Sequence, residues 1–343
     1  MVLLTFAETK VRPAAGKDSS CFTTVELEKY MSVYTPLSLT EIQQFATHYG
    51  LTVTGCQPIQ AGIENSNYFV QTENGCDYVL TLFEELNAQD AAFLAPLLQH
   101  LQQAGVSVAA PLVANNGQSL LTLKDKPAQL APRMVGEHPI QVSVTQAQVM
   151  GQQLAKLHLA LKKYPLKRTN AHGATWWQKE AAKARGGMNS IEQLILDTVL
   201  NDFEETIEDF DDLPKGLIHG DLFRDNSLFD GDKLSAILDF SEAGKDYWLL
   251  DIAITINDFC SDWPNVRLNQ DLYQAFLTGY QTVRPLTDDE QEVLPTFLAM
   301  AATRFWLSRL SVAKRNAAEG RTGENVLQKD PQQMFEMIKA RLL

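Results

Sequence analysis

The sequence predicts an α+β protein of two lobes: a small antiparallel sheet with one main helix, followed by a larger and mainly helical part. Two observations predict this class. The 343 residues correspond to roughly two domains, at about 150 residues each. Short apolar runs with strand spacing fill the first part of the chain, whereas helical spacing dominates after Gly136. We therefore expect a leader over residues 1–30, one lobe over 31–136 and a second over 137–343.

The first lobe shows strand patterns with helical stretches between them. Ser38 and Glu41 form a capping pair ahead of a short apolar helix. The dipeptide Asn74-Gly75 between two apolar runs is a strong hairpin signal. Pro96 lies inside the next helical pattern, which indicates a kink or a late start. Strands are expected over residues 67–72, 78–83, 119–123 and 128–134.

The second lobe is predicted to be mainly helical. Amphipathic spacing predicts a helix over residues 145–161, an acidic helix over 190–210 and a long helix over 287–318. Residues 217–240 interrupt this pattern with a loop and a hairpin, because Asp230-Gly231 separates two apolar runs.

Composition excludes several classes of protein. Hydrophobic residues make up 45% of the chain, which is enough for a packed core and excludes a disordered protein. The formal net charge of −13 argues against binding to nucleic acid or to an anionic membrane surface. No apolar run approaches the roughly 20 residues that cross a bilayer. The four cysteines form no Cys-x-x-Cys pair, so we expect reduced thiols and a cytoplasmic location. We also expect a monomer or small homo-oligomer.

The loop and hairpin carry the candidate chemistry. His219-Gly220-Asp221 is followed by Asn226, and the hairpin that comes next ends at Asp239. A hairpin returns its second strand to the start of the first, so Asp221, Asn226 and Asp239 should converge at one end of a two-stranded ribbon. We expect His219 to support the loop rather than to act as a base.

Protein kinases use the same residue types at the same interval. One carboxylate accepts the proton of the attacking hydroxyl, and an amide oxygen and a second carboxylate hold Mg²⁺ at the nucleotide phosphates. The alternative is an acidic hairpin with a solvated loop, because Asp-Gly and Asp-Asn pairs are common in turns. The complete string favours phosphoryl transfer.

The string resembles that of the aminoglycoside-phosphotransferase-like kinases, which are small-molecule relatives of protein kinases. Within that group the chain most resembles the homoserine kinases of bacterial threonine synthesis. The stretches that carry the resemblance are residues 31–37, 62–69, 78–82, 219–229, 250–258 and 304–310. The resemblance implies a protein-kinase-like fold, ATP and Mg²⁺ as cofactors, and a small amino-acid acceptor, L-homoserine.

The resemblance also implies roles for individual residues. Asp221 would be the catalytic base, and Asn226 and Asp239 would bind Mg²⁺. Residues 62–67 would form the turn that covers the nucleotide, and residues 132–136 the hinge that meets the adenine edge. The residues expected at the nucleotide are Gly62, Asn65, Ser66, Asn67, Arg133 and Met134.

One position departs from the protein-kinase pattern. Protein kinases place a lysine on the third strand to hold the α and β phosphates. The matching residue here is Thr81, and residues 77–83 contain no lysine. Either Lys124 or Arg133 replaces that cation, or the backbone and Mg²⁺ hold the nucleotide instead.

The acceptor-binding residues follow from the chemistry of homoserine, which carries a carboxylate and an ammonium group. Arginine is suited to a carboxylate because it can form two parallel hydrogen bonds. The candidates are Arg224, Arg304 and Arg309 for the carboxylate and Asp258 for the ammonium group. An ordinary ion pair is an equally good reading of each.

Two other functions compete with this one. The first keeps the chemistry but changes the acceptor to choline, a sugar or an aminoglycoside. The second is a nucleotide-binding module without catalysis, which only Thr81 supports. Because the resemblance begins at Met31, we also expect residues 1–30 to be dispensable.

Overall fold

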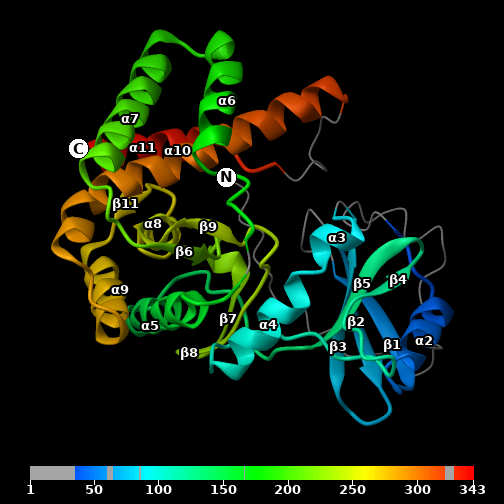
Figure 1. Cartoon of the computed structure of the whole chain (residues 1–343). Coiled ribbons are helices and arrows are strands. Elements are labelled where there is room, and N and C mark those ends of the chain that lie inside the picture. Colours follow the sequence, from blue (N-terminus) through cyan, green and yellow to red (C-terminus); the bar gives the residue numbers. More distant parts are fainter. Residues whose placement is uncertain (1–34, 60–64, 85, 166, 321–327) are drawn as a thin grey trace.

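The computed structural model describes residues 35–59, 65–84, 86–165, 167–320 and 328–343, and it confirms the predicted α+β class. A sheet lobe and a larger helical lobe lie side by side (Figure 1). The expected leader over residues 1–30 lies outside the described residues.

The sheet lobe contains one antiparallel sheet of five strands in the order β1-β2-β3-β5-β4. The hairpin predicted at Asn74-Gly75 joins β2 to β3, and Gly75 has the positive φ of 75° that such a turn needs. β4 is shorter than expected, because only residues 121–123 pair with β5. The strands are β1 (Val53–Ile59), β2 (Asn65–Thr72), β3 (Asp77–Phe83), β4 (Leu121–Leu123) and β5 (Lys126–Pro132).

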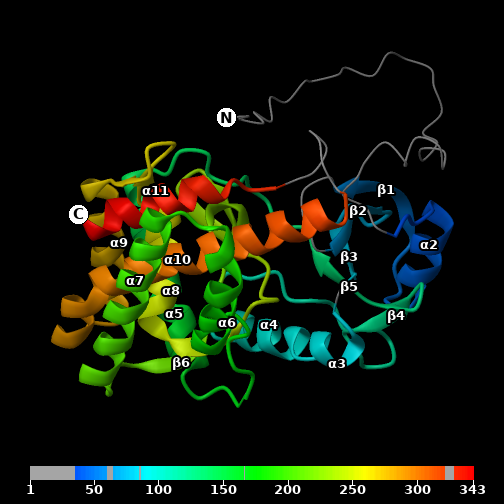
Figure 2. The same ribbon diagram turned by 90° about the horizontal axis from the view of Figure 1, so that it is seen from above.

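Helices flank this sheet. α2 (Leu39–Thr47) begins at the predicted Ser38–Glu41 capping box and packs Ile42 and Phe45 into a core with the sheet. α3 (Ala88–Ala91) is short, and α4 (Leu94–Gln103) leads toward the helical lobe (Figure 2). Pro96 lies in the first turn of α4, where a backbone N–H has no helical partner, so the late start is confirmed.

The helical lobe is built around α8, of which every residue is buried. α5 and α9 cross very closely, because a Cβ atom on Gly279 would lie 2.0 Å from the backbone oxygen of Gln148. The helices of this lobe are α5 (Val144–Leu161), α6 (Ala174–Ala184), α7 (Ser190–Asp209), α8 (Trp248–Phe259), α9 (Gln270–Val283), α10 (Asp288–Ala318) and α11 (Pro331–Leu342).

Three small ribbons complete the lobe. The predicted hairpin forms β7 (Ser227–Asp230) and β8 (Lys233–Ile237) around Gly231. The sequence did not predict β9 (Gly244–Tyr247), which pairs with β6 (Lys215–Ile218), or the short ribbon of β10 (Ser261–Asp262) and β11 (Arg267–Leu268).

Backbone hydrogen bonds join the expected hinge, residues 132–136, to the helical lobe. After β5 the chain turns at Gly136, which has a φ of 127°, and a Cβ atom there would lie 2.7 Å from the Phe229 oxygen. Glu137 then pairs with Phe229 on β7 in both directions at 2.9 Å. The hinge is thus hydrogen-bonded to the strand that follows the candidate catalytic loop.

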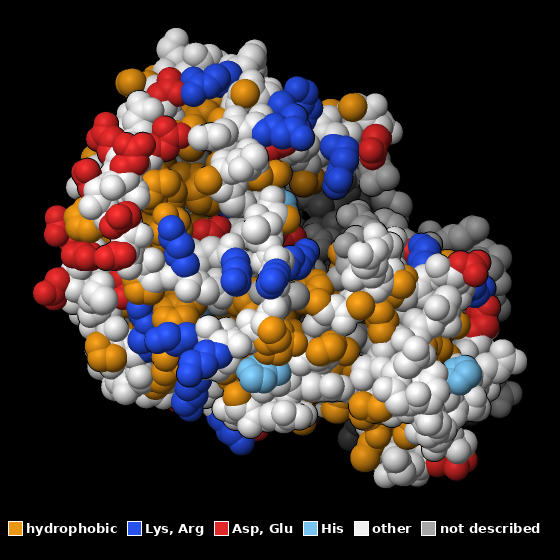
Figure 3. Space-filling view, viewed as in Figure 1, with side chains coloured by type: hydrophobic (Ala, Val, Ile, Leu, Met, Phe, Trp, Pro, Cys, Tyr) orange, Lys and Arg blue, Asp and Glu red, His pale blue; other side chains and the backbone are white. Residues whose placement is uncertain are grey.

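A group of acidic side chains lies away from this junction. Acidic side chains gather at the outer edge of the helical lobe, where α7 lies, on the face shown in Figure 3. None of the described helices is long and apolar enough to cross a membrane.

Candidate active site

The central helix α8 holds the candidate catalytic loop in place. The Asp251 carboxylate accepts the backbone N–H groups of His219 and Gly220, both at 2.9 Å, and contacts His158 Nε2 at 3.0 Å. Gly220 has a φ of 81°, which favours glycine at this bend. The fully buried carboxylate of Asp251 therefore fixes the backbone of residues 219 and 220.

His219 and His158 both make structural contacts here, and for His219 this agrees with the expectation that it supports the loop. His219 Nε2 meets the Leu238 oxygen at 2.8 Å, and His219 Nδ1 accepts the Asp221 N–H at 3.2 Å, so His219 is neutral with its proton on Nε2. His158 lies in the core, stacked on Trp248 at 5.4 Å. Neither ring is free to take a proton from a substrate.

Asp221 and Asn226 face each other across the loop. The Asn226 Nδ2 group donates to the Asp221 backbone oxygen at 2.8 Å and to Asp221 Oδ2 at 3.0 Å. A third of the Asp221 side-chain surface, 32%, stays open, yet the surrounding protein displaces enough water to raise its pKa to about 8. The positive charge of Arg304 opposes this rise.

The predicted convergence of Asp239 with the loop is supported by the backbone. The Leu238 N–H donates to the Asn226 oxygen at 2.9 Å, so the chain after β8 returns to the start of β7. Asp239 itself has a φ of 52°, and its Oδ1 accepts from Ser241 N and Oγ at 3.1 and 2.6 Å.

The Asn226 amide and the Asp239 carboxylate have the oxygen atoms that a hard cation binds. Because the Asn226 nitrogen faces Asp221, the amide oxygen of Asn226 points away from that carboxylate. The described residues contain no group of three or more His, Cys, Asp or Glu side chains that could hold a metal ion. Mg²⁺ fits such a sparse set, because it retains several waters and takes other oxygens from phosphates.

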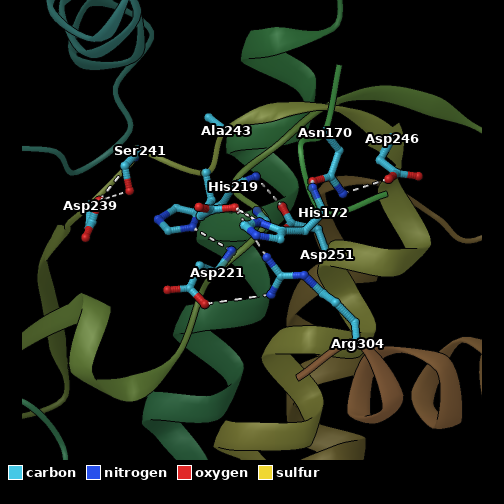
Figure 4. A network of polar contacts seen from close by, with 12 residues as sticks. Asn170, His172, His219, Asp221, Asp239, Ser241, Ala243, Asp246, Asp251 and Arg304 are labelled. Atoms are coloured by element: carbon cyan, nitrogen blue, oxygen red, sulfur yellow. Dashed lines mark hydrogen bonds and ion pairs between the residues drawn. The ribbon is translucent and has the colours of Figure 1, made fainter. Parts of the chain in front are cut away.

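Arg304 lies on α10 on the other side of Asp221 from Asp239 (Figure 4). Its guanidinium approaches Asp221 Oδ1 at 3.9 Å and Glu242 Oε2 at 3.5 Å. The side chain is only 4% exposed, yet its Nε and Nη1 atoms are buried without a hydrogen-bond partner. A buried donor without an acceptor is costly, which indicates that Arg304 is ready for an anion.

The other predicted acceptor ligands bond to protein instead. Arg224 pairs with Asp258 through its backbone N–H at 2.7 Å and its Nε at 3.0 Å. Arg309 donates to the Asp330 backbone oxygen at 2.8 Å and to Gln333 at 3.0 Å. Of the four candidates, Arg304 points at the Asp221 carboxylate with unused donors. The other three make ion pairs or structural contacts, which agrees with the alternative reading.

The expected nucleotide residues lie on both faces of the sheet. Asn67 and Thr81 are cross-strand neighbours, and the Thr81 hydroxyl donates to the Asn67 side chain at 2.8 Å. Ser66 is fully buried on the opposite face, where its hydroxyl donates to Glu84. Gly62 lies outside the described residues.

Of the remaining nucleotide residues, Arg133 and Met134 lie at the expected hinge, and Asn65 lies opposite Phe83 at the other end of β3. Arg133 pairs with Asp77 at 3.2 Å and lies over the Phe69 ring at 4.0 Å. Met134 follows it and is half-buried, and Asn65 begins β2.

Sequence reasoning missed several charged residues of the site. Glu242 contacts Arg304 and His172, and its place three residues after Asp239 was the available signal. Lys126 pairs with Glu84, but on the sheet face opposite Thr81. Lys329 contacts Asp225 from 104 residues away, and spacing gives no signal of that contact.

Comparison with known proteins identifies the family. The phosphotransferase enzyme family matches residues 55–286. A homoserine kinase of Janthinobacterium sp. (strain Marseille) is 37% identical over 284 residues, which cover 82% of this chain and 88% of the relative. A homoserine kinase of Pseudomonas aeruginosa (strain UCBPP-PA14) is 37% identical over 312 residues, 91% of this chain and 96% of the relative.

Solved structures share the fold at low identity. A microcompartment-associated aminopropanol kinase superposes with a TM-score of 0.64 at 18% identity, over 89% of this chain and 94% of that one. The amicoumacin kinase hAmiN gives a TM-score of 0.62 at 18% identity, over 93% and 95% of the two chains. The expected protein-kinase-like fold is confirmed. The chain belongs to the phosphotransferase enzyme family, and within it to the homoserine kinases.

Proposed function

We propose that this chain transfers the γ-phosphoryl group of ATP to the side-chain hydroxyl of L-homoserine and forms O-phospho-L-homoserine. The observation that carries the proposal is the partly open Asp221 carboxylate, held by Asn226 on one side and faced by the unpartnered donors of Arg304 on the other. The homoserine kinases to which the chain is similar support the choice of acceptor.

Asp221 serves as the base in this proposal. The acceptor oxygen forms a bond to the γ-phosphorus, the bond from that phosphorus to the β–γ bridging oxygen breaks, and ADP leaves. The hydroxyl proton passes to Asp221. A carboxylate whose pKa is raised to about 8 by burial is a stronger base than an ordinary aspartate.

Asn226 and Asp239 would hold Mg²⁺. The amide oxygen of Asn226 faces away from Asp221, and the Asp239 carboxylate follows β8 at the same end of the ribbon. When bound, Mg²⁺ would offset charge on the nucleotide phosphates.

The nucleotide would lie between the sheet and the hinge. We propose contacts from Asn65, Asn67 and Met134, together with the turn around Gly62. Ser66 and Arg133 are better suited to structural roles, because Ser66 is fully buried with Glu84 and Arg133 is paired with Asp77.

Arg304 would bind the carboxylate of the acceptor. Its Nε and Nη1 donors are buried without partners, and a carboxylate that accepts from either one forms a charge-assisted hydrogen bond. Asp221 lies close enough that one small molecule could reach both groups, because the Nη1–Oδ1 distance is 3.9 Å.

The test is ADP release with Mg²⁺-ATP and a panel of homoserine, choline, methylthioribose and kanamycin. Turnover with homoserine alone supports the proposal, and turnover only with another acceptor rejects it. Binding of ATP without turnover on any acceptor would favour the non-catalytic module. A cytoplasmic location and a monomer or small homo-oligomer stay predictions.

A further inference from the structure

We propose that Lys329, in the connection between α10 and α11, is a catalytic cation for the phosphoryl group during its transfer. This deepens the proposed function and rests on it. Lys329 belongs to none of the sequence motifs described above. Its proposed ligand is the phosphoryl group in transit, which carries negative charge on its oxygens.

The ammonium group of Lys329 lies on the catalytic loop itself. Its Nζ donates to Asp225 Oδ2 at 2.9 Å and lies 5.4 Å from the centre of the Phe223 ring. Both contacts fall between Asp221 and Asn226, the residues proposed as base and metal ligand.

Rigid elements fix this position from both sides. Arg309 on α10 donates to the backbone oxygen of Asp330, the residue after Lys329, and Asp330 caps the start of α11. Phe223 packs edge-on against Phe305 of α10 at 4.5 Å. The contacts of Arg309 therefore place the backbone next to Lys329, which gives this predicted acceptor ligand a positioning role.

The lysine is available for a ligand. The side chains of Lys329 and Asp225 are 54% and 58% exposed. An exposed ion pair contributes little to stability, so replacing the Asp225 carboxylate by a phosphoryl oxygen costs little. The half-exposed stem leaves the ammonium group free to follow the phosphoryl group.

The sheet lobe offers no comparable cation near the third strand. Among the described residues of that lobe, Lys124 pairs with Glu41, Lys126 with the buried Glu84, and Arg133 with Asp77. Position 81 is a threonine bonded to Asn67. A cation from the helical lobe would supply charge stabilisation that protein kinases take partly from the third strand.

The transfer step balances without any other reactant. The acceptor oxygen gains the γ-phosphorus, the bond to the bridging oxygen breaks, ADP keeps that electron pair, and the hydroxyl proton goes to Asp221. Lys329 keeps its proton throughout and donates hydrogen bonds to the phosphoryl oxygens.

Steady-state kinetics of Lys329→Ala test the proposal. We expect kcat to fall by about 100-fold, the cost typical of removing one charge-stabilising donor, with the KM of ATP and of homoserine changed less than about threefold. Lys329→Arg should keep kcat within about tenfold of the wild type, because it keeps the charge. Lys339→Ala is the matched control: Lys339 pairs with Glu336 at 2.6 Å and lies 5.3 Å from the Phe335 ring, but on α11.

Calorimetry with Mg²⁺-ADP supplies a readout independent of turnover. Aluminium fluoride added with homoserine should tighten ADP binding in the wild type and in Lys339→Ala, and should have a much smaller effect in Lys329→Ala. Three results would overturn the proposal: an unchanged kcat, a rise in homoserine KM at constant kcat, or equal tightening by fluoride in all variants. Failure of the wild type to phosphorylate homoserine would reject the proposed function instead.

Discussion

At the scale of single residues, Asp221 has the surroundings expected of a base. The change Asp221→Asn keeps the shape and the contact with Asn226 but removes the group that accepts the proton. We expect kcat to fall at least about 1,000-fold while the affinity for Mg²⁺-ADP stays within about threefold. Kinetics and calorimetry on one preparation measure both, and activity within tenfold of the wild type would mean that Asp221 is not the base.

The proposed role of Arg304 can be tested by comparing one variant on two acceptors, one with a carboxylate and one without. Arg304→Met should lower kcat/KM for homoserine by about 10- to 150-fold, because a charged hydrogen bond to the carboxylate is lost. Aminopropanol lacks that carboxylate, so its smaller kcat/KM should be affected much less. An equal loss with both acceptors would show that Arg304 acts on Asp221 rather than on the acceptor.

Spacing along the sequence is informative for site residues that share a local element. It is not informative for residues whose partners lie far away in the chain. Asp221, Asn226 and Asp239 lie on one loop and hairpin, so their spacing was informative. Arg224 and Arg309 instead have Asp258 and Asp330 as partners, and chain spacing cannot show that a cation already has an acceptor. Arg304 differs from both because its buried Nε and Nη1 donors have no partner and it lies beside Asp221.

His158 makes stability depend on pH. It is fully buried, and burial lowers its pKa, so the folded protein resists protonating it while the unfolded chain takes up a proton below about pH 6.5. The free energy of unfolding should therefore fall as pH drops from 7 to 5, by up to about 2 kcal/mol from this residue. Urea unfolding measured at several pH values should show a smaller pH dependence in His158→Gln than in the wild type. The exposed His48→Gln is the control. The same change of unfolding free energy with pH in His158→Gln and the wild type would contradict the prediction.

At the scale of elements, the fold depends on close contacts that periodicity cannot reveal. The helices α5, α7 and α10 follow their predicted ranges within a residue or so, because each carries a capping residue and a buried stripe. β9 was missed because its four residues, Gly-Lys-Asp-Tyr, show no apolar alternation, and its partner strand β6 is equally short.

The crossing of α5 and α9 supplies a test at this scale. Gly279→Ala places a Cβ atom 2.0 Å from the Gln148 backbone oxygen, so the two helices must separate. We expect a loss of about 1–3 kcal/mol in the free energy of unfolding, the usual cost of overpacking. Gly186→Ala is the control, since no atom lies within 4 Å of its Cβ position. Equal melting temperatures for both variants would contradict the close crossing.

At the scale of the whole molecule, net charge and active-site charge are separate properties. The total of −13 argues against polyanionic partners, yet Arg304 lies beside Asp221 and Lys329 beside Asp225 on the helical lobe. Acidic residues such as those of α7 lie elsewhere on the surface (Figure 3). The net charge of the chain therefore does not predict whether the candidate site can bind a phosphate group.

The N-terminal segment gives the last prediction. Thr35 is the first described residue, and it already bonds to the sheet: its N–H donates to Ser66 at 3.2 Å and its hydroxyl to Glu84 at 3.0 Å. A chain that begins at Met31 keeps these bonds, so its kcat/KM should stay within about twofold of the full chain.

A chain that begins at Ser38 is the matched comparison. It loses Thr35 and the buried Leu37, whose N–H donates to Tyr68 at 2.9 Å, next to the start of β2 and the nucleotide turn. We expect a lower melting temperature and a raised KM for ATP in this shorter chain. Loss of activity on removing residues 1–30 alone would instead assign the leader a part in the enzyme.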